Sequence, residues 1–390
     1  MILDRRAVVA GVLTVLVTGL SACRATTPDT TSATEILPEV DAIVRNHRFP
    51  GMTVAIARPD GVFTNAAGVA NRETSEPMTS DSTMLAASIG KTFVAATLLR
   101  YVDENQLTLD DPIKIWLGSR EWFKDLPNGN AITIRHLLQH QSGLPDHVYM
   151  EAFAALLPER VDSMTPEALI ALILDTQPLF APGEGWAYSD TGFLLLGLII
   201  EEVAGRTYYQ EIQDLFITEL GLDSTAPSDQ KRIPKLARGY ASPESGLNLP
   251  AVTTGEDGAM LWNPAIEWTG GGLYSTAHDL ALWGRAFLSG SLHSDDIFQQ
   301  AIIGVQTSRN DLTSLYGLGV SIRSSSAFGP VYGHRGSIPG YISSLQYYPD
   351  YDIAIAFQIN TDIGIIDVER PVIFEIEEQL ARLALADQGR

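Results

Sequence analysis

Two hairpin patterns lie at opposite ends of the chain, and they constrain its fold more than any other feature. Near the N-terminus, the apolar runs Met52–Ala57 and Val62–Val69 are joined by Pro59-Asp60-Gly61. Proline presets φ and glycine tolerates positive φ, so this tripeptide predicts a turn between two strands. Near the C-terminus, Tyr341–Tyr348 and Ile353–Ile359 flank a second turn sequence. The two chain ends are therefore expected to build one antiparallel sheet.

The chain between the hairpins is mostly helical in pattern. Apolar residues recur at helical spacing in five segments, namely Thr92–Asn105, Ile132–His140, Pro166–Asp175, Thr191–Ala204 and Asp279–Leu288. Further strands are predicted at Tyr316–Ile322 and Pro330–Tyr332. A C-terminal helix after Pro371 would place four residues on one apolar face, namely Ile373, Ile376, Leu380 and Leu383.

These elements predict the fold class α/β (α+β). An antiparallel sheet built from both chain ends would carry packed terminal helices, with a large, mostly helical insertion between the two ends. We expect one unit over residues 36–388. Its α/β part would comprise residues 36–87 and 300–388, and its helical part residues 88–299.

The first 22 residues predict a secretion signal. Arg5 and Arg6 precede an apolar run, Ala7–Leu20, that is too short to span a bilayer and has the length of a signal-peptide core. The run ends Leu20-Ser21-Ala22-Cys23, which resembles the lipobox of bacterial lipoproteins. We expect a signal peptide at 1–22, a lipidated tether at 23–35 and export to the cell envelope on a lipid anchor. A simple secretory signal followed by an incidental thiol is the alternative.

Charge and histidine spacing argue against two classes of ligand. The chain has 26 Lys and Arg against 47 Asp and Glu, a formal charge of −21, and no basic block. A phosphate backbone would be repelled, so nucleic-acid binding is not expected. His136 and His140 are four residues apart and His147 is nearby, but Leu137 stands where the metalloprotease pattern requires Glu. We expect neither a metal nor a cofactor.

Ser88-Ile89-Gly90-Lys91 is the first candidate catalytic string. It opens an apolar-periodic segment, so Ser88 would lie at a helix N-terminus with Lys91 one turn later on the same face. A lysine can activate a serine hydroxyl by taking its proton, and free N–H groups at the helix start can bind a developing oxyanion. The string also resembles the end of a phosphate-binding loop, but Leu85 occupies the position of the first glycine of that motif.

Two later strings contain further candidates. Tyr188-Ser189-Asp190 precedes a predicted helix, and Asp190 suits an N-cap without any catalysis. In the segment from Gly333 to Ser337, the pair His334-Arg335 could hold a carboxylate or an acyl oxygen, although a lone histidine is more often structural. The Gly-x-Ser-x-Gly nucleophile elbow is absent from the chain, which argues against an α/β-hydrolase.

In this order and spacing, the three strings resemble the active-site elements of the serine β-lactamase and penicillin-binding-protein family. The similarity is greatest to the branch of class C β-lactamases, D-alanyl-D-alanine carboxypeptidases and family VIII esterases. It covers roughly residues 36–385 and includes three further strings, namely His136–Leu144, Gly271–Leu280 and His334–Tyr341.

The resemblance implies a role for each matched position. Ser88 would form an acyl-enzyme, and Lys91 and Tyr188 would share the general-base and general-acid work. The backbone N–H groups of Ser88 and Ser337 would form the oxyanion hole. Substrate binding would fall to Asp190 together with His334, Arg335 and Gly336, where His334 replaces a common Lys and Arg335 a common Thr. Water would release the acyl group, with no metal.

Asp190 departs from the family pattern, because relatives that act on amides commonly carry Asn there. An ionised Asp cannot donate a hydrogen bond to an amide carbonyl, and it would favour the cationic form of Lys91. A D-alanyl-D-alanine carboxypeptidase acting on peptidoglycan-type peptides leads our hypotheses. A carboxylesterase is second and a β-lactamase third. The alternative of another class is a non-catalytic envelope protein that binds peptides. The expected ligand is a small molecule or peptide, and the sequence predicts no oligomeric state.

Overall fold

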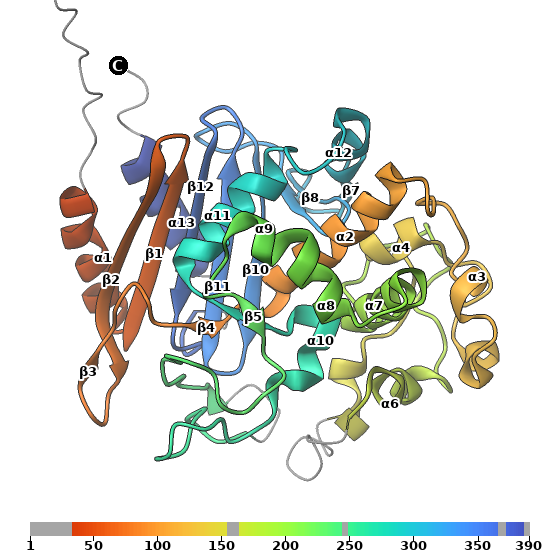
Figure 1. The fold of residues 1–390 in the computed structure, drawn as a ribbon, viewed down its shortest axis with the longest axis horizontal. Coiled ribbons are helices and arrows are strands. Elements are labelled where there is room, and N and C mark those ends of the chain that lie inside the picture. The colour runs from red at the N-terminus through yellow and green to blue at the C-terminus, as the bar shows by residue number, and fades with distance from the viewer. Residues whose placement is uncertain (1–32, 154–163, 244–248, 366–371, 386–390) are drawn as a thin grey trace, which may run out of the picture.

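A computed structural model describes residues 33–153, 164–243, 249–365 and 372–385. The predicted signal peptide and Cys23 lie outside these ranges, and residues 33–35 of the predicted tether belong to a helix, α1. Within the described ranges, a nine-stranded antiparallel sheet has the order β3-β2-β1-β12-β11-β10-β9-β8-β7 (Figure 1). Its strands are β1 (Gly51–Arg58), β2 (Gly61–Asn71), β3 (Glu76–Pro77), β7 (Val305–Gln306), β8 (Ser314–Tyr316), β9 (Ser321–Arg323), β10 (Val331–Ile338), β11 (Tyr341–Tyr348) and β12 (Ile353–Ile359).

The sheet joins the two ends of the chain at its centre. Strand β1 pairs antiparallel with β12, with Val54 opposite Phe357, and each strand also pairs with its own hairpin partner. Both predicted hairpins are therefore confirmed. The strands β1, β11 and β12 are buried along their whole length, because helices cover both faces of the sheet.

The covering helices come from three parts of the chain. Helices α1 (Ala33–His47) and α13 (Val372–Leu385) share one apolar core with one face of the sheet, and α11 (Ala277–Leu288) packs on the other face (Figure 1). In α13, Ile376 and Leu380 are fully buried as predicted, whereas Leu383 is only partly buried. Both terminal helices thus pack on the sheet, as the sequence predicts.

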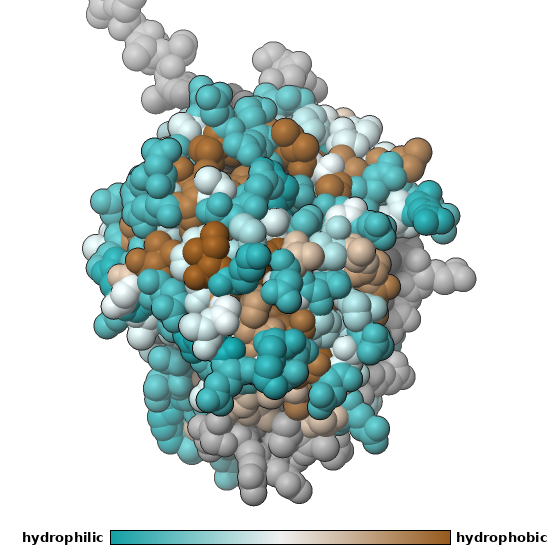
Figure 2. Space-filling view, turned by 90° about the vertical axis from the view of Figure 1, so that its right-hand side faces the viewer, coloured by the Kyte–Doolittle hydropathy of each residue, from teal (hydrophilic) through white to brown (hydrophobic). Residues whose placement is uncertain are grey.

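The second layer is helical and lies beside the sheet. Its central helix, α7, is buried along its apolar run Phe193–Ile200, as expected for a helix surrounded by others. The α-helices of this layer are α2 (Lys91–Asp103), α3 (Lys114–Leu117), α4 (Ile134–Leu138), α6 (Pro166–Ile170), α7 (Asp190–Ala204), α8 (Tyr208–Ile212), α9 (Thr218–Leu220), α10 (Trp268–Gly271) and α12 (Asp295–Ala301). Figure 2 shows this side of the molecule, where hydrophilic residues surround separate apolar ones.

Short elements connect the two layers. A three-stranded sheet has the order β4-β6-β5, from β4 (Met84–Leu85), β6 (Leu273–Ser275) and β5 (Ala226–Pro227). A 3-10 turn, η1 (Ala87–Gly90), runs directly into α2. None of the helices in the described ranges combines the length and apolar character needed to cross a bilayer.

Three predicted elements differ from the structure. The single strand predicted at Tyr316–Ile322 is two strands, β8 and β9, because the Gly317 N–H donates to Val320 O at 2.8 Å and closes a turn between them. The strand predicted to end at Tyr332 continues as β10 to Ile338. The helix predicted over Pro166–Asp175 ends as α-helix at Ile170 and continues as one 3-10 turn.

Candidate active site

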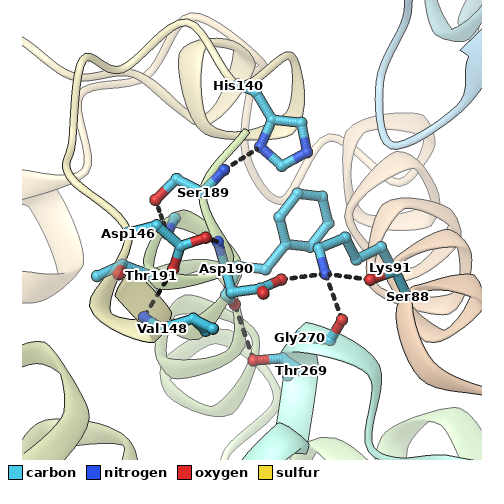
Figure 3. A network of polar contacts seen from close by, with 12 residues as sticks. Ser88, Lys91, His140, Asp146, Val148, Ser189, Asp190, Thr191, Thr269 and Gly270 are labelled. Carbon is cyan, nitrogen blue, oxygen red and sulfur yellow. Dashed lines mark hydrogen bonds and ion pairs between the residues drawn. The ribbon is translucent and has the colours of Figure 1, made fainter. Parts of the chain in front are cut away.

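Ser88 and Lys91 lie together at the junction of η1 and α2. Their side chains share a helix face, and Lys91 Nζ lies 3.2 Å from Ser88 Oγ. The Lys91 side chain has no solvent exposure. Its ammonium group also donates to the carbonyl oxygen of Gly270 and forms an ion pair with Asp190 (Figure 3). The structure therefore brings a serine hydroxyl, a buried lysine and a carboxylate into one cluster.

The backbone just before Ser88 is strained. Ala87 has φ +48°, a left-handed conformation that is costly for a residue with a Cβ. Gly271 permits this turn, because a Cβ there would lie 2.5 Å from the carbonyl carbon of Ala87. The close approach of the Gly270-Gly271 segment also brings the Gly270 carbonyl to Lys91. Strain of this kind is common where a fold holds a reactive group in place.

Ser189, and not Asp190, caps helix α7. The Ser189 hydroxyl accepts the N–H of Gly192 at 3.3 Å, and Asp190 is the first residue of the helix. The interpretation of Asp190 as an N-cap is therefore wrong. Its side chain points instead to Lys91 (Figure 3). Asp190, for which the resemblance implies Asn in relatives that act on amides, thus lies inside the cluster.

Tyr188 precedes this cap and lies over the same lysine. Lys91 Nζ is 5.0 Å from the centre of the Tyr188 ring. Burial raises the pKa of the Tyr188 phenol well above its ordinary value, the Asp190 carboxylate raises it further, and the Ser88 hydroxyl opposes this increase. Tyr188 is consequently a protonated phenol at neutral pH.

His334 lies on β10 with both ring nitrogens occupied. Nδ1 lies 2.6 Å from the carbonyl oxygen of Arg335, which can only accept, so Nδ1 carries the proton. Nε2, 2.8 Å from the hydroxyl of Tyr316, must then accept from it. Burial, followed by the charge of Lys91, lowers the pKa of His334 to about 3. The ring is therefore neutral and held by two hydrogen bonds, and no sequence motif indicates its partner Tyr316.

Arg335 lies on the opposite face of the sheet from His334, because neighbouring side chains of a strand alternate. Its guanidinium forms two hydrogen bonds of 2.6 Å with Glu377 of α13. The sequence predicts that Arg335 binds substrate, whereas the structure directs its side chain to α13, away from Lys91 and Ser88. Gly336 does face the site: a Cβ there would lie 2.2 Å from Ala86 O. Only glycine lets β10 approach the turn that carries Ser88 so closely.

The backbone of Ser337 lies on an open edge of β10. Ile338 pairs with Tyr341 across the tight turn to β11, and hydrogen-bonded and non-bonded pairs alternate along such a ladder. The N–H of Ser337 therefore points away from β11. On that other edge, β9 pairs only with residues 331–333. In the part of the chain that the structure describes, no strand pairs with the edge near Ser337, and that edge adjoins η1.

Two acidic residues that the sequence interpretation missed complete the cluster. Asp146 accepts the N–H groups of Asp190 at 3.1 Å and Val148 at 3.3 Å. Burial raises the pKa of Asp146, and the neighbouring Asp190 carboxylate adds to this effect. The same two causes raise the pKa of Glu267, which lies before α10. No local motif marks either residue, since their proximity arises from tertiary packing.

The three histidines considered for a metal make separate contacts. His136 accepts the N–H of Thr133 at 3.2 Å in a capping box, and His140 accepts that of Ser189 at the same distance. His147 lies 3.0 Å from the Thr191 hydroxyl. Within the described ranges, no group of three or more His, Cys, Asp or Glu is arranged to hold a metal ion.

Comparisons with known proteins agree with this arrangement. Penicillin-binding protein 4* of Bacillus subtilis (strain 168) is 26% identical over 328 residues, covering 83% of this chain and 70% of the relative. A D-aminopeptidase of Brucella anthropi is 26% identical over 342 residues, 87% of this chain; the chain spans only 61% of that relative. The crystal structure of a D-stereospecific amidohydrolase from Streptomyces sp. superimposes with a TM-score of 0.73 at 30% identity, covering 86% of this chain and 95% of that one.

The family match covers most of the chain. The family model described as Beta-lactamase matches residues 38–374. The range contains every residue of the cluster around Lys91 described above. The chain belongs to the Beta-lactamase family, and it is a serine hydrolase of that family.

Proposed function

We propose that Ser88 is the nucleophile of a hydrolase that works through an acyl-enzyme. The contact of 3.2 Å between Lys91 Nζ and Ser88 Oγ carries this proposal, because it places a buried amine within reach of the hydroxyl proton. Ser88 Oγ attacks the substrate carbonyl carbon and its proton passes to the base. The tetrahedral intermediate then expels the leaving group, which takes up a proton. Water attacks the acyl-enzyme and regenerates Ser88.

Lys91 and Tyr188 share the proton transfers in this scheme. Lys91 is held by Asp190 in the resting site and has to release a proton before it can act as a base. Tyr188 is protonated at neutral pH, so it suits the donation of a proton to the leaving group. The Ser88 hydroxyl acts on the Tyr188 phenol and lies 3.2 Å from Lys91 Nζ, so both groups adjoin the proposed nucleophile.

The backbone N–H groups of Ser88 and Ser337 are proposed as the oxyanion hole. Ser88 lies in the first turn of the continuous helix formed by η1 and α2, where N–H groups lack intrahelical partners. The N–H of Ser337 points to the open edge of β10 beside that turn. Two such donors would stabilise the negative oxygen that develops during attack.

The geometry favours substrates with an uncharged or basic group near the scissile bond. Two residues are expected from the sequence to meet a substrate carboxylate. Arg335 is bound to Glu377 on the face of the sheet covered by α13, and His334 is neutral, so neither offers a positive charge to such a group. Asp190, whose side chain is 23% exposed, places a carboxylate beside Lys91. The relatives named D-aminopeptidase and D-stereospecific amidohydrolase add support. We therefore propose D-amino acid amides or peptides with a free amino terminus. The D-alanyl-D-alanine carboxypeptidase hypothesis stays a prediction with less support, and esters remain the alternative substrates.

Intact-protein mass spectrometry of a chain beginning at Arg24 tests the proposal. The protein is mixed with penicillin, p-nitrophenyl acetate, D-alanine p-nitroanilide or N-acylated D-Ala-D-Ala, and each probe is followed in parallel. We expect an added acyl mass or turnover that is lost in Ser88→Ala, with the free-amine anilide cleaved faster than the acylated dipeptide. Rapid loss of penicillin would favour a β-lactamase. Binding that survives in Ser88→Ala without turnover of any probe would identify a non-catalytic binder.

The place of action is also a proposal. We propose that the protein is held at the cell envelope by a lipid on Cys23, on the strength of the Leu-Ser-Ala-Cys string alone. Wild-type protein should partition into the detergent phase and Cys23→Ser should not. Equal membrane association of the two proteins would contradict the anchor.

A further inference from the structure

Among the described residues, no strand pairs with β10 on the edge where it meets the turn that carries Ser88. From His334 onward, β10 has β11 on one edge and the turn carrying Ser88 on the other. Backbone hydrogen bonds therefore fix this part of β10 from one edge only. A side-chain contact on the face of the sheet that α13 covers can supply a further restraint on this part of β10.

Arg335 makes such a contact. Its Nε and Nη2 donate to the two carboxylate oxygens of Glu377, each at 2.6 Å, which is the bidentate geometry of the strongest charged pairs. The guanidinium carbon also lies 4.0 Å from the centre of the Phe374 ring. Both Glu377 and Phe374 belong to α13. Helix α13 thus contacts β10 at Arg335, between His334 and Gly336.

Glu377 binds the neighbouring strands as well. It accepts the hydroxyl of Ser344 at 2.6 Å and the amide of Gln346 at 3.2 Å, both on β11, and lies 3.7 Å from Arg323 of β9. The Glu377 side chain has no solvent exposure. One buried carboxylate therefore connects β9, β10 and β11 to α13, and its partners satisfy it fully enough to tolerate burial.

We propose that Glu377 is a positioning residue for catalysis, which acts through Arg335 to hold the Ser337 N–H at the correct distance from Ser88. This inference rests on the proposed function, since it requires that Ser337 contributes to an oxyanion hole. It assigns a role to the C-terminal helix, which lies on the opposite face of the sheet from the nucleophile.

The test compares Glu377→Gln, Arg335→Gln and the double variant in hydrolysis of an ester and of the thionoester with sulfur in place of the carbonyl oxygen. We expect each single variant to lower kcat for the ester at least tenfold, with KM changed less than twofold. The thionoester, which depends less on the oxyanion hole, should be affected less. The double variant should be no worse than Glu377→Gln alone, because Arg335→Gln then removes a contact that is already lost.

Arg58→Met is the matched control. Arg58 also ties α13 to the sheet, through a 3.0 Å hydrogen bond to Ala384 O, but at β1 and away from β10. It should lower the melting temperature while leaving kcat unchanged. Equal loss of kcat in Arg58→Met, additive losses in the double variant, or unchanged kcat in the folded single variants would each overturn the inference.

Two failures can be told apart from a failure of the inference, namely a Glu377→Gln protein that does not fold and a wild-type protein without activity. If Glu377→Gln does not fold, Arg335→Gln carries the test, because the Arg335 side chain is 31% exposed and Glu377 keeps its partners on β9 and β11. A wild-type protein without Ser88-dependent turnover of any probe would overturn the proposed function, and this inference with it. Wild-type turnover with unaffected variants would overturn this inference alone.

Discussion

Lys91 and Asp190 form an ion pair at the centre of the site, and the lysine is completely buried while the aspartate side chain is 23% exposed. The pair joins the first residue of α2 to the first residue of α7, so the two helices that follow the candidate strings meet at these charges. The same lysine lies 3.2 Å from the Ser88 hydroxyl. The amine proposed to act on Ser88 is therefore paired with a carboxylate in the resting site.

Asp190→Asn should favour amide over ester substrates. The Asp190 carboxylate is paired with Lys91 and can only accept hydrogen bonds, whereas the amide of Asn can also donate one to a substrate carbonyl. We expect the ratio of kcat/KM for D-alanine p-nitroanilide to that for p-nitrophenyl acetate to rise by about three- to tenfold, the usual size of one hydrogen bond.

Asp110→Asn is the control for this substitution. Asp110 forms an ion pair with Arg135 at 2.7 Å, but its side chain is 71% exposed and lies outside the cluster. Its ratio of amide to ester cleavage should equal that of the wild type. An unchanged ratio in Asp190→Asn would show that this side chain does not meet the substrate carbonyl.

Gly336→Ala should separate β10 from the nucleophile turn. A Cβ at this position would lie 2.2 Å from Ala86 O and 2.3 Å from Ser343 Oγ, distances that force a movement of the backbone. We expect a loss of about 1–3 kcal/mol in the free energy of unfolding, measured by urea denaturation. Activity should fall at least tenfold. In Gly192→Ala, where the nearest atom would be an ordinary 3.5 Å away, both quantities should stay near wild type.

The fold and the proximity of Ser88 to Lys91 could be predicted because their signals are local. The turn at Pro59-Asp60-Gly61 and the apolar periodicity of α7 depend on neighbouring residues only, and both elements occur where predicted. The spacing of Ser88 and Lys91 on one helical turn is local in the same way. The resemblance of three strings to one family then indicated which distant segments meet.

The directions of individual side chains could not be predicted. One residue along a strand changes the face, so His334 and Arg335 are neighbours in sequence but face opposite layers. Asp146 and Glu267 meet Lys91 only because separate loops fold over it, and neither lies in a recognisable pattern. The role of Ser189 as N-cap was missed because Asp190 is an equally good capping residue by composition.

His334→Gln should make the protein less sensitive to acid. His334 has a pKa of about 3 when folded and an ordinary value of 6.5 when unfolded, so the unfolded chain binds more protons between these values. The free energy of unfolding therefore falls as pH decreases below about 6.5, by up to about 1.4 kcal/mol per pH unit for this group. Gln can replace both neutral hydrogen bonds without titrating.

Urea denaturation from pH 7 to pH 4 measures this slope. The His334→Gln variant still contains His140 and His147, whose pKa values burial also lowers. The substitution should therefore reduce the slope of unfolding free energy against pH without removing it. Activity at neutral pH should stay within a few-fold of wild type, because the neutral Gln side chain can replace the neutral His334 ring in both hydrogen bonds. A slope equal to that of the wild type would mean that His334 is protonated in the folded protein.

Tyr188→Phe should slow turnover by about two orders of magnitude or more, the usual contribution of a positioned general acid or base. Phenylalanine keeps the aromatic face that lies 5.0 Å from Lys91 Nζ, so the melting temperature should change little and the loss can be assigned to the hydroxyl. Because the phenol is protonated at neutral pH, its removal takes away the donor for the leaving group. The defect should consequently be larger for an anilide, whose amine must be protonated, than for a p-nitrophenyl ester, whose phenolate leaves unaided. Rapid-mixing measurements of the acylation rate with both substrates test this difference. Equal losses for the two leaving groups would assign Tyr188 to the activation of Ser88 instead.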